Sequence, residues 1–519
     1  MAHPVVEAPS ARLAVAITAT LTAGVIAVGV VPFIHHRTLG GSGDQLRYFE
    51  QAGALLPFTD HYYGPIYFVA LRVVRDVLGA DWFTATKLVS LLSALPFLYA
   101  AFVLFRRRFS VPLSCAGIAL LATNPNFINE TYHDYNTLFA AMLVCLAIVT
   151  WPEASDKPVH RPLLCGLLFG LAMLTRFQAF GFLVGLSVGV LVTLHPPVRT
   201  PLRNLALGAS IPLACMRLCG MFLRYRQGFV PVNHNLVHLT KALGDFQDFN
   251  DVPAAIAKYG SMRGVLSTPG AIPRIFWYGV LRFVAFPRAV GLDLLGPLLP
   301  FSLAGAALWL RRVRHMPAWY ISMLVALFLT CLAGSKWLLY YTAFLPFFVA
   351  LVLDGLQALE RRVTGADAAT LDYVICVAAL PWSVSWVRQT YRDREWPEWA
   401  EARAYLERHA APCDLVTSTA GSLPYGTTMR FVNREDIMRP SDADSPAVLR
   451  ARNVTLVVLT QRHRYNEYPA LARLLLAQPG ELPAGVSRDT LIDGPHPLAI
   501  LRIAPAPRSC PVEANAPSN

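Results

Sequence analysis

The chain has 519 residues, of which 55% are hydrophobic and only 15% are charged, and its mean hydropathy is +0.43. Ordinary soluble domains carry about 25% charged residues, so this composition excludes a soluble globular protein. The net charge of +12 does not require a nucleic acid as partner, because basic loops beside anionic phospholipid headgroups account for much of it. We therefore expect an integral membrane protein that contacts membrane lipids and no nucleic acid.

Apolar runs of membrane-spanning length recur along most of the chain. The first, residues 11–34, is near the ~20 residues needed to cross a bilayer and lacks a convincing signal-peptide cleavage site. We expect it to be retained as an anchor. Further runs bring the predicted number of transmembrane helices to about eleven. They lie at residues 82–105, 111–128, 135–151, 162–177, 178–194, 203–222, 292–310, 316–334, 338–359 and 368–387.

Basic residues in the short loops set the expected orientation, since Lys and Arg beside spans stay on the cytoplasmic side. They fall in alternate loops, at Arg106/Arg107/Arg108, Lys157/Arg161, Arg199/Arg203, Arg311/Arg312/Arg314 and Arg361/Arg362. We therefore place the N-terminus in the cytoplasm and the C-terminal part outside, in a bacterial cytoplasmic (inner) membrane. Residues 275–286 are interpreted as interfacial or re-entrant, because counting them as a span would invert everything after them.

Residues 388–519 are polar and differ in composition from the rest of the chain. They contain strand-like runs, separated by helical or turn-rich segments, at 413–419, 454–460, 489–494 and 498–503. We expect a small external (periplasmic) α/β domain that ends in a disordered tail from about residue 505. Of the nine cysteines, Cys413 and Cys510 lie in this domain. They either form a disulfide or are two free thiols, and the sequence leaves both alternatives open.

The ionisable residues of the apolar region gather on one side of this topology. Ionisable groups at membrane depth cost about 2.5–3.5 kcal/mol each and usually face a cavity or pair with one another. We therefore predict a polar chamber at the outer leaflet, formed by the first external loop (residues 35–81), a second external loop and the ends of later spans. Its candidate residues are Asp44, Glu50, Asp60, His61, Glu130, His133, Asp134, Arg176, Gln178 and Lys336.

The stretch GSGDQLRYFEQAGALL, residues 41–56, interrupts the apolar N-terminal region with charged side chains. A short helix along the membrane surface would have one polar and one apolar stripe here. The polar stripe holds Asp44, Arg47, Tyr48 and Gln51, and the apolar stripe holds Leu46, Phe49, Ala52 and Leu56. Asp44 is either a helix cap or a chemical group. Ser42 and Gln45 already match a capping box, which leaves Asp44 available for chemistry.

An acid in the first external loop, then RYFE, then the aromatic segment HYYGPIYFVA (61–70) resemble the GT-C superfamily of membrane glycosyltransferases, which take sugars from polyprenyl phosphates. The loop is similar to that of the lipid A aminoarabinose transferase, with relatives among the protein O-mannosyltransferases and the rhizobial galacturonosyltransferases. Two later stretches agree: the Gly-rich span with a Thr-Arg pair at 166–185, and the span with Lys, Tyr and Pro at 336–352. The resemblance implies a GT-C type transmembrane catalytic domain at residues 1–387.

The resemblance also implies a reaction and the residues that carry it. In such enzymes the acceptor attacks the anomeric carbon of the donor sugar, with inversion, as the lipid phosphate leaves. By resemblance Asp44 is the catalytic base and Asp134 a second catalytic acid. The leaving phosphate requires cations, for which the candidates are Arg47, Arg176 and Lys336. Further candidate substrate-binding residues are Tyr48, Glu50, His133, Tyr340 and Tyr341.

Simpler interpretations of these residues stay open. In the simpler interpretation, Arg176 and Lys336 extend their charged ends to the lipid headgroups. Arg47 then pairs with Glu50 or Glu130. A bound divalent cation stays open as a cofactor, and its candidate ligands are Asp44, Glu130 and Asp134. No other cofactor is expected.

The sequence departs from the aminoarabinose transferase pattern at two positions. Gln45 stands where a second acid is expected beside Asp44, and Gly64 stands where a lysine is expected before the surface proline. The first departure weakens a two-carboxylate metal site, and the second removes a phosphate contact that another cation must replace. We therefore do not extend aminoarabinose or lipid A to this chain.

The predicted function is an inverting glycosyltransferase at the outer face of the membrane, which moves a sugar from a polyprenyl phosphate to a cell-envelope glycan, lipid or protein acceptor. A transporter or flippase of a lipid-linked saccharide is the alternative from another class, although its charges should lie near the bilayer midplane. A diphosphate-linked glycan polymerase or ligase remains a third interpretation. The long external loop, residues 223–291, either covers the chamber and selects a substrate or is an inert connector.

Overall fold

The computed structural model describes most of the chain. The described residues are 9–35, 48–49, 51–53, 64–132, 135–152, 159–193, 198–226, 236–245, 252–311, 316, 318–332, 338–364, 370–392, 397–411, 413–418, 430–432, 445–460, 473–475, 477–494 and 497–504. The chain divides into two compact units, one of Met1–His35 and Gln51–Arg388 and the other of His36–Glu50 and Gln389–Asn519. Each unit is described by itself.

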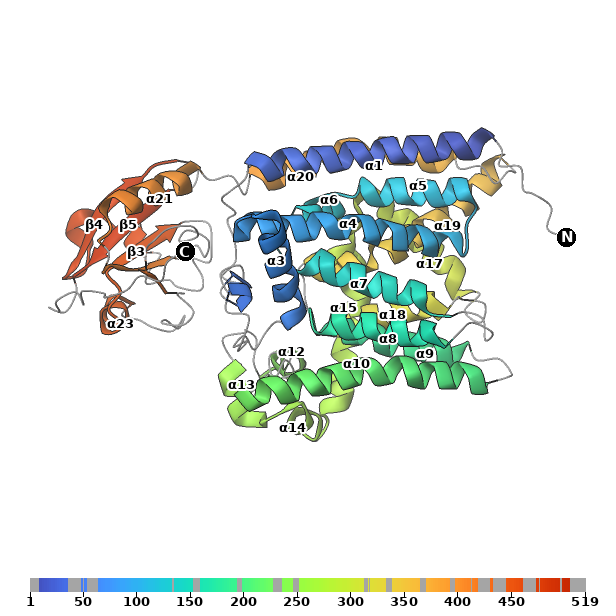
Figure 1. Ribbon diagram of the computed structural model, residues 1–519, viewed down its shortest axis with the longest axis horizontal. Helices are drawn as coiled ribbons and strands as arrows, with labels where there is room; N and C mark the ends of the chain where they lie inside the picture. The colour runs from blue at the N-terminus through green and yellow to red at the C-terminus, as the bar shows by residue number, and fades with distance from the viewer. Residues whose placement is uncertain are drawn as a thin grey trace. The chain divides into compact units, whose positions relative to one another are not determined.

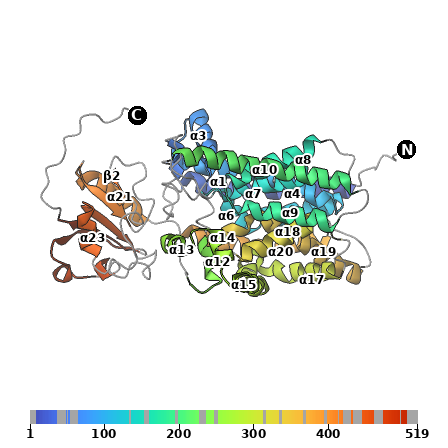
Figure 2. The ribbon, with the colours of Figure 1, turned by 90° about the horizontal axis from the view of Figure 1, so that it is seen from below.

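The first unit is a helical bundle whose long helices run along a common direction (Figures 1 and 2). These are α1 (Pro9–His35), α4 (Trp82–Arg106), α5 (Val111–Ala122), α7 (Thr137–Thr150), α8 (His160–Met173), α9 (Ala179–Val192), α10 (Arg199–Arg226), α17 (Leu299–Leu310), α18 (Ala318–Leu332), α19 (Leu345–Thr364) and α20 (Thr370–Arg392). Shorter elements are α3 (Pro65–Leu78), α6 (Pro125–Thr131), α12 (Leu236–Lys241), α13 (Val252–Tyr259), α14 (Met262–Leu266), α15 (Ala271–Phe286), α16 (Leu292–Leu295) and the 3-10 helix η5 (Leu338–Phe344).

Each predicted span coincides with helical structure, but their number stays a prediction. By length and hydropathy, three helical segments in the described part of the chain qualify as spans: Thr84–Arg106, Ala271–Leu310 and Tyr340–Arg362. Helices α5 and α6 qualify together as a fourth, although they are bent by 67°. Other apolar helices are shorter than this test requires. The unit therefore holds several candidate membrane spans.

The segment Ala271–Leu310 is helical over 40 residues, yet it is not one straight helix. After α15 the chain passes through a π-helical turn, Pro287–Gly291, and a 3-10 turn, Gly296–Leu298, before α17 begins. Gly296 has φ 52° and ψ −126°, a conformation that residues with a side chain rarely adopt. Helix α15 crosses the direction of α17 (Figure 2). The interfacial placement of residues 275–286 stays a prediction.

Glycines bring neighbouring bundle helices into direct backbone contact. A Cβ atom at Gly185 or Gly189 of α9 would lie 2.2 Å from the carbonyl oxygen of Ser322 or 2.4 Å from that of Ala318, both in α18. In lipid, helix association depends on such close packing of small residues, because lipid tails are as apolar as the side chains. The Gly-rich sequence of α9 therefore determines how closely it packs on α18.

An ion pair between a partly exposed arginine and a buried carboxylate ties the chain after α4 to α17, α18 and α19. The Nη2 atom of Arg108 lies 2.5 Å from Oδ1 of Asp354, whose side chain is 5% exposed. Trp309 Nε1 and Tyr320 OH donate to the other carboxylate oxygen over 2.7 and 3.0 Å. The Arg108 guanidinium also lies over the Trp309 ring, 4.1 Å from its centroid. Arg108, predicted only as a topological signal, is therefore part of the bundle's packing.

The second unit contains a mixed sheet with strand order β2-β1-β3-β5-β4. Its strands are β1 (Leu415–Ser418), β2 (Arg430–Phe431), β3 (Leu456–Thr460), β4 (Val486–Ile492) and β5 (Leu498–Ile503). Strand β1 is parallel to β2 and β3, whereas β5 is antiparallel to β3 and β4. The four predicted strands are confirmed. The sequence pattern missed β2, because two residues are too short to show an alternation.

Helices α21 (Pro397–His409) and α23 (Ser445–Ala451) supply apolar side chains to two cores of this unit. Val458 of β3 belongs to one core together with Trp399 of α21, and the neighbouring Val457 belongs to the other with Leu449 of α23. Successive residues of a strand point to opposite faces, so β3 is buried on both sides. Cys413 is disulfide-bonded, and Cys510 lies outside the described residues.

Asp354→Asn should destabilise the bundle, because it removes the charge that compensates Arg108 while nearly preserving volume. Removing one partner of a fully buried ion pair costs about 3–5 kcal/mol, and the loss is smaller here because the Arg108 side chain is 30% exposed. The unfolding temperature of the purified protein in detergent measures the loss. Asp76→Asn is the matched control, since Asp76 pairs with Arg72 at the surface and its side chain is 49% exposed. Equal unfolding temperatures for the two variants would contradict the role of Asp354.

Candidate active site

Arg176 lies in the break between α8 and α9 and is buried, with 8% of its surface exposed. Its Nη1 atom donates to the hydroxyl of Thr137 over 2.6 Å, and its Cζ atom lies 5.0 Å from the centroid of the Tyr340 ring. The structure thus brings two predicted site residues, Arg176 and Tyr340, together. Since Arg176 is enclosed by the bundle, the alternative in which it reaches out to the headgroups is wrong.

The turn that carries Arg176 is held by hydrogen bonds. The Thr175 hydroxyl donates to the carbonyl of Leu171 over 2.9 Å, and the Arg176 amide donates to that of Ala172 over 2.7 Å. Asn136, which is fully buried, donates its side-chain amide to the Thr175 carbonyl over 3.3 Å. The start of α7 therefore fixes the break between α8 and α9.

A polar stripe on α4 reaches the same region. Ser90 donates to the carbonyl of Tyr135 over 3.3 Å, which links α4 to the residues just before α7. Lys87, one turn earlier on the same face of α4, is 2% exposed. A lysine is almost never fully buried unless it is paired. The sequence analysis missed Lys87, although a single lysine within the apolar run 82–105 was a usable signal.

Glu130 lies on α6, which bends away from α5 at Asn124. The Asn124 side chain accepts from the amides of Asn126 and Phe127 over 3.0 and 3.3 Å, so it caps α6. It also donates to the carbonyl of Leu294 in α16 over 2.9 Å. Glu130 is 4% exposed and accepts from Asn129 over 3.4 Å. The bend therefore places a buried acid inside the bundle.

Gly64, one of the two departures from the aminoarabinose transferase pattern, has a structural reason. A Cβ atom there would lie 1.7 Å from the carbonyl oxygen of Leu174. The amide of Ile66, at the start of α3, also donates to that oxygen over 3.4 Å. The backbone of residues 64–66 therefore packs directly on the turn that carries Arg176, and no lysine fits at position 64.

The remaining predicted residues are placed as follows. Asp44, Arg47, Glu50, His133, Asp134 and Lys336 lie outside the described residues, and their roles stay predictions. Tyr48 is fully buried, and Tyr341 is 1% exposed with its ring 5.2 Å from that of Phe286. Among the described residues, no group of three or more metal-ligating side chains occurs, so a metal site also remains a prediction.

The expected stripes of the helix at residues 41–56 are only partly observed. Tyr48 and Gln51 belong to the predicted polar stripe, and Phe49 and Ala52 to the apolar one. All four are buried, with exposures of 8% or less. Burial alone does not say which surroundings each stripe meets, so the division into two stripes stays a prediction.

Comparisons with known proteins show which families and folds this chain resembles. Residues 63–217, which include Lys87, Glu130 and Arg176, match the protein family described as dolichyl-phosphate-mannose-protein mannosyltransferase. The fold resembles that of ArnT from Cupriavidus metallidurans bound to undecaprenyl phosphate, with a TM-score of 0.55 at 14% identity over 94% of this chain and 97% of that one. The chain therefore has the fold of membrane glycosyltransferases of the GT-C kind, and the segment that carries Arg176 matches a family named for dolichyl-phosphate mannose.

Two further structures share this fold. The Archaeoglobus fulgidus oligosaccharyltransferase, in complex with zinc and sulfate, has a TM-score of 0.59 at 14% identity, over 89% of this chain and 69% of that one. AglB from the same organism, in complex with an inhibitory peptide and a dolichol phosphate, has a TM-score of 0.51 at 13% identity, over 87% and 71% of the two chains. No curated protein sequence matches significantly. The comparisons favour an enzyme over the transporter alternative.

Gly64→Ala should reduce any sugar transfer, because the new methyl group would push α3 away from the Arg176 turn. A displacement of about 1 Å in an active site can cost 10²-fold in rate. The rate of transfer of labelled sugar in membranes measures the effect. Gly53→Ala is the control, since a Cβ atom there meets only the Trp82 side chain at 3.7 Å. Similar rates for both variants would show that the contact does not position the turn.

Proposed function

We propose that this enzyme moves a sugar, with inversion, from a polyprenyl phosphate to a cell-envelope acceptor at the outer face of a bacterial inner membrane. The acceptor class is a glycan, a lipid or a protein. The observation that carries the proposal is Arg176, a buried guanidinium held by Thr137 and Tyr340 in an apolar bundle. Buried charges inside membrane proteins usually mark substrate pathways. The undecaprenyl phosphate and dolichol phosphate of the two similar structures support a lipid phosphate as its ligand.

The reaction proceeds by a single displacement. A hydroxyl of the acceptor attacks the anomeric carbon, the bond from that carbon to the phosphate oxygen breaks, and the lipid phosphate leaves with the electron pair. Asp44 accepts the proton of the acceptor hydroxyl, and Asp134 orients the acceptor. Arg176 stabilises the charge on the leaving phosphate, because its planar fork of donors matches two phosphate oxygens.

Lys87 replaces the cation that Gly64 cannot supply. The side chain is buried on α4, one turn from Ser90, and Ser90 contacts Tyr135 close to the start of α7. Asn136 then connects this region to the turn of Arg176. We assign Lys87 as a second cation for the donor phosphate, together with Arg47 and Lys336. A lysine contributes a point charge, whereas an arginine also fixes the orientation of the phosphate.

Asp44→Asn should abolish transfer of radiolabelled sugar from a panel of polyprenyl-phosphate donors to membrane extract, because the amide cannot accept the proton. The purified wild type, the variant and the control Asp76→Asn are compared after their unfolding temperatures have been shown to be equal. Labelling that survives in Asp44→Asn would remove Asp44 from the chemistry. No labelling by the wild type with any donor would overturn the proposed function.

Arg176→Lys should lower kcat about 10²–10³-fold, the usual cost of removing one donor from a developing negative charge. Lys87→Met should lower activity, and its unfolding temperature, measured in parallel, separates the loss of a phosphate contact from a loss of folding. Single-turnover rates with saturating donor measure both effects. Arg72→Lys is the control, because Arg72 pairs with Asp76 at the surface. Wild-type rates in both Arg176→Lys and Lys87→Met would contradict their assignment to the phosphate.

A further inference from the structure

The described part of the predicted long loop is a folded platform, formed by α12, α13, α14 and the start of α15. It has a small core of its own in which Ala255, Val265, Ala271 and Ile275 are buried. Leu332, the last residue of α18, packs against this core. Helices α12, α13 and α14 lie at the same end of the bundle as α3 (Figures 1 and 2). The platform is therefore tied to the bundle near the region that carries the candidate active site.

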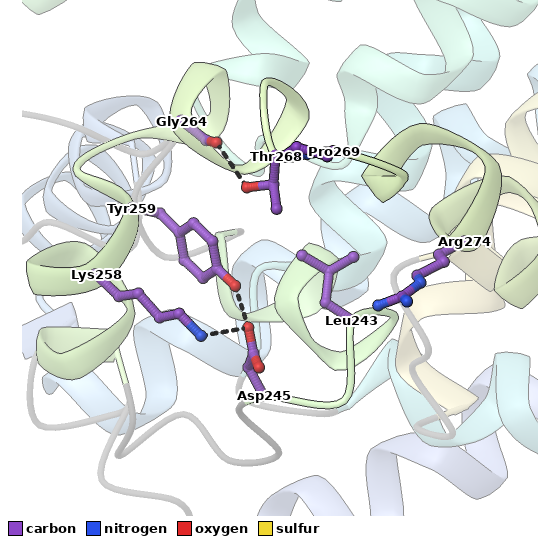
Figure 3. A pocket seen from close by; sticks show the side chains of 8 residues that line it. All are labelled: Leu243, Asp245, Lys258, Tyr259, Gly264, Thr268, Pro269 and Arg274. Carbon is purple, nitrogen blue, oxygen red and sulfur yellow. Dashed lines mark hydrogen bonds and ion pairs between the residues drawn. The ribbon is translucent and has the colours of Figure 1, made fainter.

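A pocket of about 470 Å³ opens on this platform (Figure 3). Its polar wall is formed by Asp245, Lys258, Tyr259, Thr268 and Arg274. Lys258 Nζ donates to Oδ2 of Asp245 over 2.9 Å, and the Tyr259 hydroxyl donates to the same oxygen. Its size falls within the ~300–1,000 Å³ of small-molecule sites. Asp245 and Lys258 are 30% and 51% exposed, so a ligand in water reaches them.

The charges of the pocket leave it positive. The hydrogen bonds from Lys258 and Tyr259 lower the pKa of the Asp245 carboxyl, so Asp245 is ionised at neutral pH and is already paired with Lys258. Arg274 stands on the other side of the pocket from Lys258 (Figure 3). Two cations therefore face one carboxylate. A guanidinium prefers planar anions such as carboxylate and phosphate, which it binds through two parallel hydrogen bonds.

The neutral groups of the pocket suit a sugar ring. Tyr259 lines the pocket while its ring packs against the platform core and lies under Lys258 Nζ, 5.1 Å from the ring centroid. The Thr268 hydroxyl, which donates to the Gly264 carbonyl over 3.2 Å, still has lone pairs for a second hydrogen bond. A polyprenyl chain, by contrast, requires an apolar groove. The donor phosphate already has the buried Arg176 within the bundle. The pocket therefore matches the hydrophilic substrate better than the lipid donor.

We propose that this pocket binds an anionic sugar of the acceptor, one that bears a carboxylate or a phosphate, with Arg274 as its main anion contact. The assignment deepens the proposed function and rests on it. It also gives the platform a role in acceptor selection, in place of the inert connector that the sequence left open.

The test is direct binding to the full-length protein in detergent, which requires no turnover. Glucuronate, glucose 1-phosphate and glucose are titrated by saturation-transfer NMR. The two anionic sugars should bind at least tenfold more tightly than glucose, and Arg274→Gln should remove this preference. Arg263→Gln is the matched control, because Arg263 is exposed on α14 and does not line the pocket. Its affinities should stay within twofold of the wild type.

Several results would overturn the assignment. They are equal affinities for glucose and the anionic sugars, an unchanged preference in Arg274→Gln, and displacement of glucuronate by undecaprenyl phosphate, which would give the pocket to the donor. If Arg274→Gln unfolds, Arg274→Lys keeps the charge and should bind the anions more weakly but still above glucose. Anion binding without transfer from any donor would refute only the proposed function. Transfer with an unchanged acceptor KM in Arg274→Gln would refute only the pocket.

Discussion

Close backbone contact between helices is the constraint on which this bundle depends. Where solvent does not drive helices together, they must approach closely enough for their backbones to touch. Gly185 and Gly189 allow this between α9 and α18, and Gly64 allows it between the start of α3 and the turn after α8. Residues 64–66 thus pack on the turn that carries Arg176, and α9, the helix that follows this turn, packs on α18. A side chain that binds a ligand is positioned more precisely when its backbone is fixed in this way.

Two arginines of the bundle show how the same side chain serves different purposes. Arg108 meets the carboxylate of Asp354 together with the indole and phenol donors of Trp309 and Tyr320, and its side chain is 30% exposed. An ion pair of this kind stabilises a fold. Arg176 is buried inside the bundle, where it donates to the hydroxyl of Thr137 and lies over the ring of Tyr340. Its burial among apolar helices supports its proposed assignment to the lipid phosphate.

The polar groups of the first unit separate into two environments, to which the proposals assign different substrates. Arg176, Lys87 and Glu130 are buried among apolar helices, where charge interactions are strong, and the lipid-linked donor is assigned there. Asp245, Lys258 and Arg274 line an open pocket on the helical platform, to which the hydrophilic acceptor is assigned. A transferase that joins a lipid-borne sugar to a polar acceptor needs both environments at one end of the bundle.

The sequence by itself determined the membrane class, the positions of the long apolar helices and four of the five strands, because apolar runs and alternation are local properties of the chain. It also named Arg176 and Tyr340, but only the tertiary structure decided that they touch, since 164 residues separate them along the chain. The burial of Lys87, the 67° bend at Asn124 and the reason for Gly64 were equally beyond a local pattern. The last two depend on a neighbour that is remote in sequence: the carbonyl of Leu294 for Asn124, and that of Leu174 for Gly64.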